Sequence, residues 1–517
     1  MENFLDKLLN YYHLTYDEYS TLTQEPSFDL LPSPYNFKDM DSLIKYLNEK
    51  MNQNAKILIY GDYDCDGVMS TSILFNSFAK KGYKVGYYVP NRVHDGYGLS
   101  REKINYFKSL GYSLIICVDN GITLVDEVDY LNSIDMECVI IDHHTPLDVL
   151  PKAKYILHPT VSEFGKIFLS AGGVSFFFSR AFLNYDDPYL CVLGAISTIS
   201  DMMELKDYNR ELVRLGLKLL NENRYLNIDL LAKCDGFYTE EIIGGIVAPK
   251  INAIGRMCED NSIFNVVRYF TTDKPELFPK RAERIESINN KRKDTIADFL
   301  TDTDIDKYNS KGNAIVEIVD VGEGLIGLIA NRLMNAFDKP TVIFTKANDG
   351  TLKGSARSKP GFNIIKCYES LNDLLLSNGG HAMAGGLSIK ESSFEEFKTR
   401  FNKLASEYPF EQNEIQPIII SSMDINSKNF EIYRSFGPFG QGNKQILFKI
   451  DNFAENQLHF SKDNKHIITR LSMNSTLIYF NYDKTITDKK IVNFYGYFDC
   501  HTYKNHIDYQ FKVTKVD

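Results

Sequence analysis

Between residues 56 and 158, short apolar runs alternate with segments of helical periodicity. The apolar runs, which predict strands, cover residues 56–60, 83–89, 114–118, 137–142 and 154–158. The helical segments between them cover residues 67–81, 101–110 and 123–133. Such alternation predicts parallel strands joined by crossover helices that cover both faces of the sheet. This part of the chain is therefore expected to be an α/β domain with a mostly parallel sheet.

The rest of the chain divides into regions with different predicted secondary structure. Residues 172–300 are largely helical and end in a polar helix over 280–294, and a second strand–helix alternation begins at 313. From residue 415 the chain consists of short β-rich runs, which predict a small β-barrel such as an OB-fold. The expected regions are an N-terminal helical and loop segment (1–50), an α/β domain (51–205), a helical region with a connector helix (206–310), a second α/β lobe (311–408) and a β-barrel (409–517).

Composition excludes several classes of protein. The 517 residues are 44% hydrophobic and 24% charged, which is typical of globular domains. A formal net charge of −10 argues against a wholly basic nucleic-acid coat protein, although a local basic groove remains possible. The eight cysteines form no CxxC pair, so neither a zinc site nor a disulfide framework is expected. With no long apolar run and no secretory pattern, we expect a soluble, cytoplasmic protein.

An acidic run follows the first predicted strand directly. Asp62, Asp64 and Asp66 occupy alternate positions of YGDYDCDG (60–67), and Gly67 is expected to open the next helix. Side chains at alternate positions of an extended segment point the same way. Carboxylates held that close repel one another unless a cation neutralises them. For this run taken alone, a solvated acidic turn is the alternative.

Further acids and histidines follow the next predicted strands. Asp119 follows the third strand, Asp142, His143 and His144 follow the fourth, and Asp201 ends an apolar helix. The carboxyl ends of parallel strands meet at one edge, where open α/β sheets bind ligands. Each residue alone could be a helix cap or a turn residue, but together they predict a metal site. Carboxylates with imidazole suit Mn²⁺ or Mg²⁺, and there are enough of them for two ions, an arrangement that serves phosphoryl transfer.

Eight motifs also carry a family resemblance. DYDCDG, VDNG, DHH and SDMMEL, in this order, resemble the four motifs of the DHH phosphoesterase superfamily. NAIGRM, GSARS and GGHAMAGG resemble the RecJ-type arrangement with its DHH-associated second lobe, and PFGQGN resembles the entry into its C-terminal OB-fold. The resemblance covers residues 25–517. It implies a metal-dependent, single-stranded-DNA-specific exonuclease that works 5′→3′, releases 5′-mononucleotides and serves DNA repair and recombination.

The resemblance also implies roles for the acidic and histidine residues. The implied metal ligands are Asp64, Asp66, Asp119, His143 and Asp201. Among them Asp119 is expected to bridge two ions. Asp62 is either a ligand or a hydrogen-bond acceptor behind the ligands, and Asp142 is expected to orient a histidine. His144 is expected to contact phosphate or to donate a proton.

Phosphate contacts are expected from the second lobe. Arg357 lies in a Gly/Ser context where backbone N–H groups and a guanidinium can converge on an oxyanion, although an ordinary surface arginine is the alternative. His381 lies in a glycine-rich stretch read as a loop, which could equally be a tight turn before a strand. The predicted phosphate-binding residues are Arg256, Ser355, Arg357, Ser358, Gly380 and His381.

The C-terminal region is expected to hold DNA and to take no part in the chemistry. Strand alternation predicts that about half of its aromatic side chains are core and that the others are free to stack on bases. The aromatic residues in question are Phe448, Phe453, Tyr479, Phe480, Phe494, Tyr495 and Phe498. Single-stranded DNA is the expected partner, with a single-strand-binding protein or a helicase as candidates, and we expect a monomer that does not contact membrane.

At one position of the expected metal site the sequence departs from the superfamily's pattern, and two alternative functions stay open. Tyr60 stands where many members of the superfamily have a metal-binding histidine. One alternative is a DHH phosphodiesterase acting on short oligoribonucleotides, phosphoadenosine phosphate or cyclic dinucleotides, but such proteins typically lack a C-terminal OB module. The other is a non-catalytic replication scaffold, which should have lost motif aspartates that this chain retains.

Overall fold

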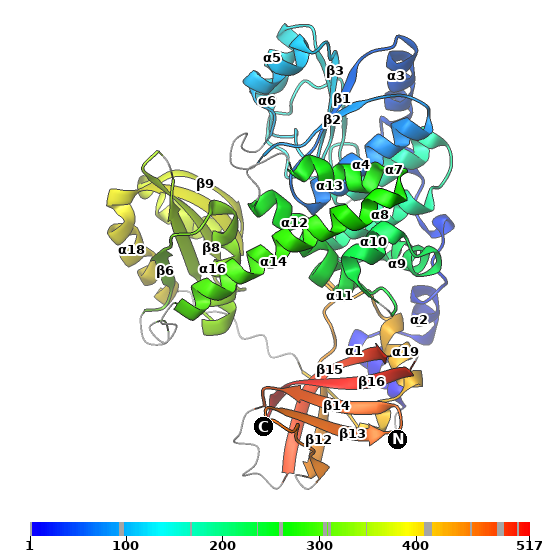
Figure 1. The fold of residues 1–517 in the computed structure, drawn as a ribbon, viewed down its shortest axis with the longest axis vertical. Coiled ribbons are helices and arrows are strands. Elements are labelled where there is room, and N and C mark those ends of the chain that lie inside the picture. The colour runs from blue at the N-terminus through cyan, green and yellow to red at the C-terminus, as the bar shows by residue number, and fades with distance from the viewer. Residues whose placement is uncertain are drawn as a thin grey trace. The chain divides into compact units, whose positions relative to one another are not determined.

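The computed structural model describes residues 3–91, 98–165, 168–234, 236–257, 262–302, 308, 312–347, 349–407, 416–454, 457–482, 491–503 and 506–517. The chain forms two units (Figure 1). Unit 1 comprises Met1–Pro249, Phe264–Ala282 and Ile415–Asp517, and unit 2 comprises Lys250–Ile263 and Glu283–Glu414. Within the described ranges, no helix has both the length and the apolar character that a membrane crossing requires.

The parallel sheet predicted for residues 56–158 lies in unit 1. Its strand order is β2-β1-β3-β4-β5, and every pair is parallel. β1 and β3 are fully buried, which explains why the sequence shows them as continuous apolar runs. The strands are β1 (Ile57–Tyr60), β2 (Gly86–Tyr88), β3 (Leu114–Val118), β4 (Glu137–Ile141) and β5 (Tyr155–Leu157).

Helices cover both faces of this sheet (Figure 1). α5 (Arg101–Ser109) and α6 (Val125–Ser133) pack on one face, where alternate strand residues such as Leu58 and Cys117 join their core. α4 (Cys65–Lys80) and α7 (Ala171–Leu183) pack on the other face. Further helices of unit 1 are α3 (Met40–Asn52), α8 (Pro188–Ser200), α9 (Asp207–Asn223), α10 (Leu226–Ala232), α11 (Glu240–Ile242) and most of α13 (Ser262–Thr271). α12 (Ala248–Met257) belongs to unit 2 from Lys250 on.

Unit 2 is built on a second, mixed sheet with the order β6-β7-β8-β10-β9. β6 and β7 are parallel, and the remaining pairs are antiparallel. The strands are β6 (Ile315–Ile318), β7 (Thr341–Lys346), β8 (Thr351–Arg357), β9 (Leu375–His381) and β10 (Ala384–Lys390). The helices are α14 (Phe278–Asp302), which extends the predicted polar helix at both ends, α16 (Glu323–Phe337), α17 (Ile364–Ser370) and α18 (Phe394–Glu407).

Two sequence predictions for unit 2 were wrong. The stretch GGHAMAGG is not a loop but a strand hairpin, in agreement with the alternative of a tight turn before a strand, because only Ala382 and Met383 lie between β9 and β10. Two of its four glycines, Gly380 and Gly385, serve close packing: a Cβ on Gly380 would lie 2.4 Å from the carbonyl oxygen of Ala384. The stretch GSARS begins inside β8, which pairs with strands on both sides. Its backbone N–H groups therefore belong to the sheet and do not converge on an anion.

The C-terminal barrel has the strand order β11-β12-β15-β16-β14-β13 and belongs to unit 1. Four of its predicted aromatic residues, Phe448, Phe453, Phe494 and Phe498, are buried, whereas Phe480 is 56% exposed. The alternation argument was therefore correct. The elements are β11 (Ile418–Ile420), α19 (Ser427–Ser435), β12 (Phe448–Ala454), β13 (His466–Ser472), β14 (Ser475–Phe480), β15 (Ile491–Tyr503) and β16 (His506–Val516).

The first helix of the chain completes the core of this barrel. α1 (Phe4–Tyr12) and α2 (Tyr16–Leu22) are the N-terminal helices. The ring of Phe4 lies 5.9 Å from that of Phe448 and 5.6 Å from that of Phe498, between centroids. Leu8 and Leu9 join the same buried cluster. The two ends of the chain therefore share one hydrophobic core.

Buried charged groups hold the segment that leads into the barrel. Arg434 pairs with Glu240 of α11 at 2.6 Å, and Glu240 also accepts the backbone N–H of Phe439 at 2.7 Å. Arg210 of α9 donates to the carbonyl oxygen of Gly437 at 2.8 Å. Because breaking a buried ion pair leaves an unpaired charge, these contacts resist separation. They fix the barrel against the helices of unit 1.

Candidate metal centre

The acidic run after β1 bends around the start of α4. Asp64 is the N-cap of this helix, and its side chain accepts the backbone N–H of Gly67 at 3.0 Å. The helix therefore begins at Cys65, two residues earlier than predicted, and Asp66 lies in its first turn. The three aspartates do not continue along one extended segment. Asp62 and Asp64 are instead grouped with Asp119, and Asp66 is grouped with His143 and Asp201.

The N-terminus of α7 holds the carboxylate of Asp66. Asp66 accepts the N–H groups of Ala171 at 2.9 Å and Gly172 at 2.8 Å, and the hydroxyl of Ser197 at 2.5 Å. The positive end of the helix dipole favours a carboxylate at this place. A Cβ on Gly172 would lie 2.3 Å from the Ser197 Oγ, so only glycine fits. Sequence reasoning missed these supports, although the small residues at 170–173 before an apolar helix were a usable signal.

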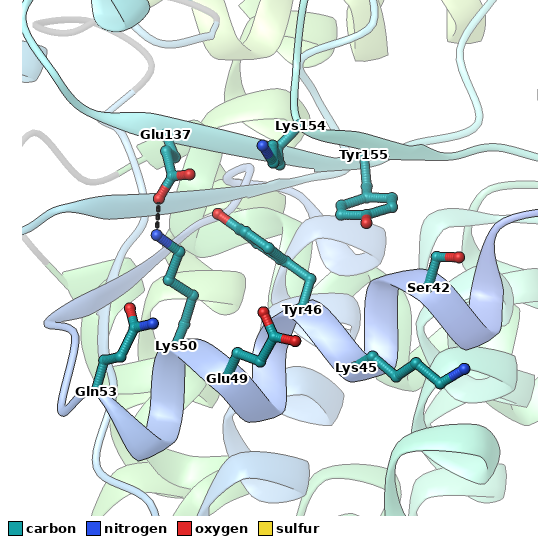
Figure 2. A pocket seen from close by; sticks show the side chains of 9 residues that line it. All are labelled: Ser42, Lys45, Tyr46, Glu49, Lys50, Gln53, Glu137, Lys154 and Tyr155. Atoms are coloured by element: carbon teal, nitrogen blue, oxygen red, sulfur yellow. Dashed lines mark ion pairs between the residues drawn. The ribbon is translucent and has the colours of Figure 1, made fainter.

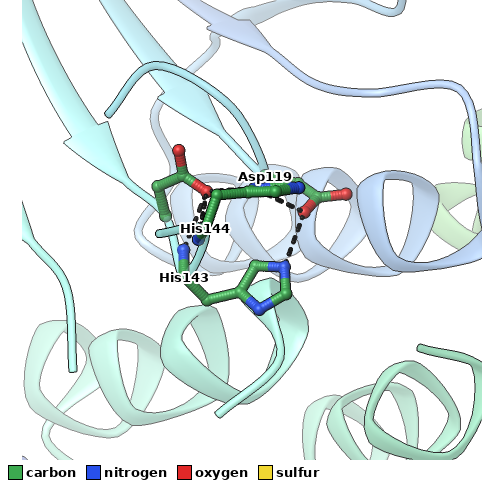
Figure 3. A group of neighbouring side chains, drawn as sticks. Asp119, His143 and His144 are labelled. Atoms are coloured by element: carbon green, nitrogen blue, oxygen red, sulfur yellow. Dashed lines mark hydrogen bonds and ion pairs between the residues drawn. The ribbon is translucent and has the colours of Figure 1, made fainter. Parts of the chain in front are cut away.

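His143 lies at the centre of the site. Its Nε2 is 3.3 Å from Asp119 Oδ1 (Figure 3). The same atom is 3.6 Å from Asp66 Oδ2 and 3.7 Å from Asp201 Oδ2. Asp201 follows α8, and the other residues follow β1, β3 and β4, so four elements contribute. The candidate metal-binding groups, each with ligand atoms within 4.8 Å, are Asp119–Asp142–His143–His144, Asp66–His143–Asp201 and Asp62–Asp64–Asp119.

Electrostatics within this cluster favour a bound cation. Burial, together with the nearby carboxylates of Asp66 and Asp64, raises the pKa of Asp119 well above its usual range. The same causes raise the pKa of Asp201. Burial lowers the pKa of His143, which leaves its imidazole neutral and able to bind a metal. Carboxylate oxygens around a neutral imidazole fit Mn²⁺ or Mg²⁺, and a divalent cation would relieve the repulsion.

Asp142 orients the histidine pair. Its Oδ1 accepts the backbone N–H of His143 at 2.7 Å and lies 2.8 Å from the Nδ1 of His144. Although burial acts the other way, the hydrogen bond with His144 lowers the pKa of Asp142 to about 2. Burial likewise opposes protonation of His144, but the hydrogen bond and charge of Asp142 raise its pKa to about 9. His144, whose side chain is 40% exposed, is thus a protonated donor at the surface of the cluster.

Comparison with known proteins agrees with this geometry. Models of three families match: the DHH family, N-terminal domain, over 56–196; the DHHA1 domain over 311–407; and the RecJ OB domain over 418–515. The single-stranded-DNA-specific exonuclease RecJ of Salmonella typhimurium is 30% identical over 454 residues, which is 79% of this chain and 77% of the relative. The chain belongs to the RecJ family.

Two further comparisons describe the extent of the likeness. RecJ of Bacillus subtilis is 30% identical over 435 residues, so the match covers 81% of this chain and 55% of that relative. The chain thus spans about half the length of the Bacillus relative and about three quarters of the Salmonella one. The crystal structure of RecJ in complex with Mn²⁺ from Thermus thermophilus matches with a TM-score of 0.83 at 24% identity, over 99% of this chain and 75% of that chain. The predicted fold, including the C-terminal OB domain, is confirmed.

Within unit 2, two predicted phosphate-binding arginines lie against the first turns of α16. Arg256 Nη1 donates to the carbonyl oxygen of Gly324 at 3.4 Å. A Cβ on Gly327, one turn later, would lie 2.8 Å from Arg357 Nη2 and 3.0 Å from Ser355 Oγ. Arg357 Nη1 donates to Ser355 Oγ at 3.0 Å. The helix therefore brings these three RecJ-motif side chains to one region of unit 2.

The other predicted phosphate-binding residues divide into two kinds. His381 is exposed and lies on the same rung of the sheet as Arg357, with Ala384 between them. Ser358 is 5% exposed, and its hydroxyl donates to the carbonyl oxygen of Phe362 at 2.7 Å, so it ties the end of β8 to the following loop. Gly380, at φ 135°, serves the hairpin geometry. We therefore retain His381 as a candidate contact and assign Ser358 and Gly380 to the fold.

A separate pocket lies at the amino ends of β4 and β5, the edge opposite the acidic cluster (Figure 2). Tyr46 and Tyr155 line it with their rings 5.3 Å apart, and Lys50 pairs with Glu137. None of the predicted site residues is among those that line it. Among the described residues, its charged lining consists of three lysines and two glutamates, without histidine or aspartate, so this pocket does not compete with the acidic cluster as the candidate metal site.

Proposed function

We propose that this chain is a divalent-metal-dependent exonuclease that hydrolyses single-stranded DNA. It works from the 5′ end, releases 5′-mononucleotides and serves DNA repair and recombination. The observation that carries the proposal is the convergence of Asp66, Asp119 and Asp201 on His143, with the pKa of Asp119 raised by burial and by its carboxylate neighbours. The relatives are single-stranded-DNA-specific exonucleases, and this supplies the proposed substrate class.

The residues proposed to hold Mn²⁺ or Mg²⁺ are Asp64, Asp66, Asp119, His143 and Asp201. Asp119 and His143 each belong to two of the candidate groups, so we assign the bridging position to Asp119. Asp62 is grouped with Asp64 and Asp119 and serves as a further carboxylate. When bound, such ions stabilise charge on phosphoryl oxygens and lower the pKa of bound water.

His144, held by Asp142, is proposed to donate a hydrogen bond or a proton to the substrate. Asp142 Oδ1 lies 2.8 Å from His144 Nδ1. Against the effect of burial, the hydrogen bond and charge of Asp142 raise the pKa of His144 to about 9 in the metal-free protein, which favours the charged ring at neutral pH. The Nε2–H of the imidazolium can then donate a hydrogen bond to a phosphate oxygen or a proton to the leaving 3′-oxygen. A charged donor at this place stabilises an anionic product better than water does.

Unit 2 is proposed to bind the phosphate of the strand. Arg256 and Arg357 supply guanidinium groups, and His381 lies on the rung of Arg357. Arginine suits this task because its planar fork can donate two hydrogen bonds to one phosphate. The barrel is proposed to hold the strand further along, where the exposed Phe480 is available for stacking on a base.

End-labelled substrates test the proposal directly. Single strands labelled at the 5′ or 3′ end are incubated with the enzyme and Mn²⁺, with EDTA, duplex DNA and cyclic dinucleotides as controls. We expect immediate release of a labelled mononucleotide from the 5′-labelled strand and progressive shortening of the 3′-labelled strand. Activity in EDTA, or preference for the cyclic dinucleotide, would contradict the proposal.

A further inference from the structure

His158 lies at the carboxyl edge of the parallel sheet, one strand away from the histidine pair. It follows β5 as Asp142 follows β4, and these strands pair with Ile141 beside Leu157. At the end of this ladder, the N–H of Asp142 bonds to the carbonyl oxygen of Leu157 at 3.2 Å. Beyond Asp142, the next link between the two strand ends is made by a side chain. The imidazole of His158, only 1% exposed, bonds to the backbone carbonyl oxygen of His144.

The contacts of this ring determine which nitrogen carries the proton. Nδ1 of His158 lies 3.2 Å from the backbone nitrogen of Thr160 and 3.3 Å from that of Val161. Both neighbours are N–H donors, so Nδ1 accepts and carries no proton. Nε2 therefore carries the proton and donates to the carbonyl oxygen of His144 at 2.8 Å. Burial lowers the pKa of His158 and keeps this neutral form.

The backbone of the histidine pair is thus held from two neighbouring strands. On one side, Asp142 accepts the N–H groups of His143 at 2.7 Å and His144 at 3.3 Å. On the other side, His158 binds the carbonyl group of His144. With the backbone fixed at both ends, the ring of His143 is aimed at Asp119 and the ring of His144 at Asp142.

We propose that His158 is a positioning residue for the metal centre. It holds the His144 carbonyl group and thereby fixes the backbone from which both imidazoles project. The inference rests on the proposed metal site and deepens it. Loss of a group that orients metal ligands weakens metal binding by about 10- to 100-fold, and we expect a change of that size in the Mn²⁺ dissociation constant.

Two conservative variants of His158 test the contacts of its two ring nitrogens one at a time. His158→Gln keeps an amide donor near the position of Nε2 but offers no acceptor near Nδ1. His158→Asn keeps an acceptor for the N–H groups of Thr160 and Val161 but is too short to reach the His144 carbonyl oxygen. His158→Ala removes both contacts.

Mn²⁺ binding to the metal-free protein is measured from the electron paramagnetic resonance signal of free Mn²⁺, so the readout does not depend on activity. The thermal midpoint in EDTA is recorded for the same samples. We expect His158→Ala and His158→Asn to bind Mn²⁺ about 10-fold more weakly or worse, and His158→Gln to stay within about 3-fold of the parent.

Ser162→Ala is the matched control. Ser162 Oγ accepts the N–H of His158 at 3.1 Å and donates to Ile156 at 2.7 Å, so its loss loosens the same loop without touching His144. We expect this variant to lower the thermal midpoint and leave Mn²⁺ affinity unchanged. If it weakens binding as much as His158→Ala, or if Asn rescues binding where Gln does not, the inference fails. If the parent protein binds no Mn²⁺, the proposed metal site fails with it.

Discussion

Tyr60 donates its hydroxyl to the backbone carbonyl oxygen of Gly98 at 2.8 Å. The phenol is fully buried, and its ring lies 5.6 Å from that of Tyr88, between centroids, in the aromatic core under α5. At the place where many DHH-superfamily members have a metal-binding histidine, this chain therefore has a residue directed into the core. The set of metal ligands must therefore be complete without an imidazole from position 60.

This relationship predicts that Tyr60→Phe leaves metal binding intact. The buried carbonyl group of Gly98 loses this hydrogen bond, so we expect the free energy of unfolding to fall by about 1–3 kcal/mol. The Mn²⁺ concentration for half-maximal activity should not change. Chemical denaturation and a Mn²⁺ titration of nuclease activity are the measurements. A rise of about tenfold or more in that Mn²⁺ concentration would assign Tyr60 to the metal centre.

Loss of a central ligand should abolish activity without unfolding the protein. We expect Asp119→Asn and His143→Ala each to reduce the rate by at least about 100-fold, as expected when metal-supporting groups are lost. Asp119→Asn also removes a carboxylate whose pKa is raised by burial and by its neighbours, so the metal-free protein should be as stable as the parent or more stable. Steady-state rates and melting in EDTA test both statements. Near-full nuclease activity of either variant would refute the proposed ligand set.

The stability of the metal-free protein should depend on pH through Asp201. Burial and neighbouring carboxylates raise the pKa of Asp201 from 3.8 to about 8 in the folded state. A group whose pKa is raised by folding stabilises the protein at low pH, and that contribution is lost as the pH rises through its folded pKa. In EDTA, the melting temperature of the parent should therefore fall relative to Asp201→Asn between pH 4 and 8. Parallel curves for the two proteins would contradict this assignment.

Arg357 should decide how strongly a 5′-phosphate is preferred. With Arg357→Ala, 5′-phosphorylated and 5′-hydroxyl strands should be degraded at more similar rates than by the parent. Gly327→Ala is a matched variant, because its added Cβ would lie 2.8 Å from the guanidinium and displaces it without removing the charge. We expect an intermediate preference for that variant. An unchanged preference in Arg357→Ala would remove this residue from the terminal-phosphate site.

Phe480 should contribute to binding of long strands. Base stacking is worth about 1–3 kcal/mol per base, so Phe480→Ala should weaken binding of a long single strand roughly 5- to 150-fold. Turnover of a very short oligonucleotide should change little. Phe237→Ala, which alters another exposed phenylalanine (70% exposed), is the control and should affect neither substrate. Equal losses on long and short strands would indicate that Phe480 stabilises the barrel and does not contact DNA.

The residues at the carboxyl edge of the parallel sheet could be predicted from the sequence. Buried parallel strands are continuous apolar runs, so the residues that end them, such as Asp119 and Asp142, can be placed at one edge. It was less predictable which residues of different motifs lie next to one another. Asp66 separates from Asp62 because the N-cap of Asp64 starts the helix early, and Ser197, which bonds to Asp66, comes 131 residues later.

Other features had no local signal. The glycines of GGHAMAGG suggest a loop, yet a Cβ on Gly385 would lie 2.8 Å from the ring of Tyr368, a distant neighbour that sequence alone does not reveal. Among the described residues, the hydrogen bonds of the His158 ring go to the backbone of His144, Thr160 and Val161, and backbone groups leave no mark on a sequence pattern. The packing of α1 in the barrel likewise depends on partners more than 400 residues away.

That packing has a consequence during protein synthesis. Phe4, Leu8 and Leu9 leave the ribosome more than 400 residues before their partners Phe448 and Phe498. At roughly 5–20 residues per second, α1 waits on the order of tens of seconds for the surface that buries it. Throughout that interval its apolar face is exposed beside a growing chain. The nascent protein should therefore be captured by holding chaperones through the apolar face of α1, and release should coincide with formation of the barrel.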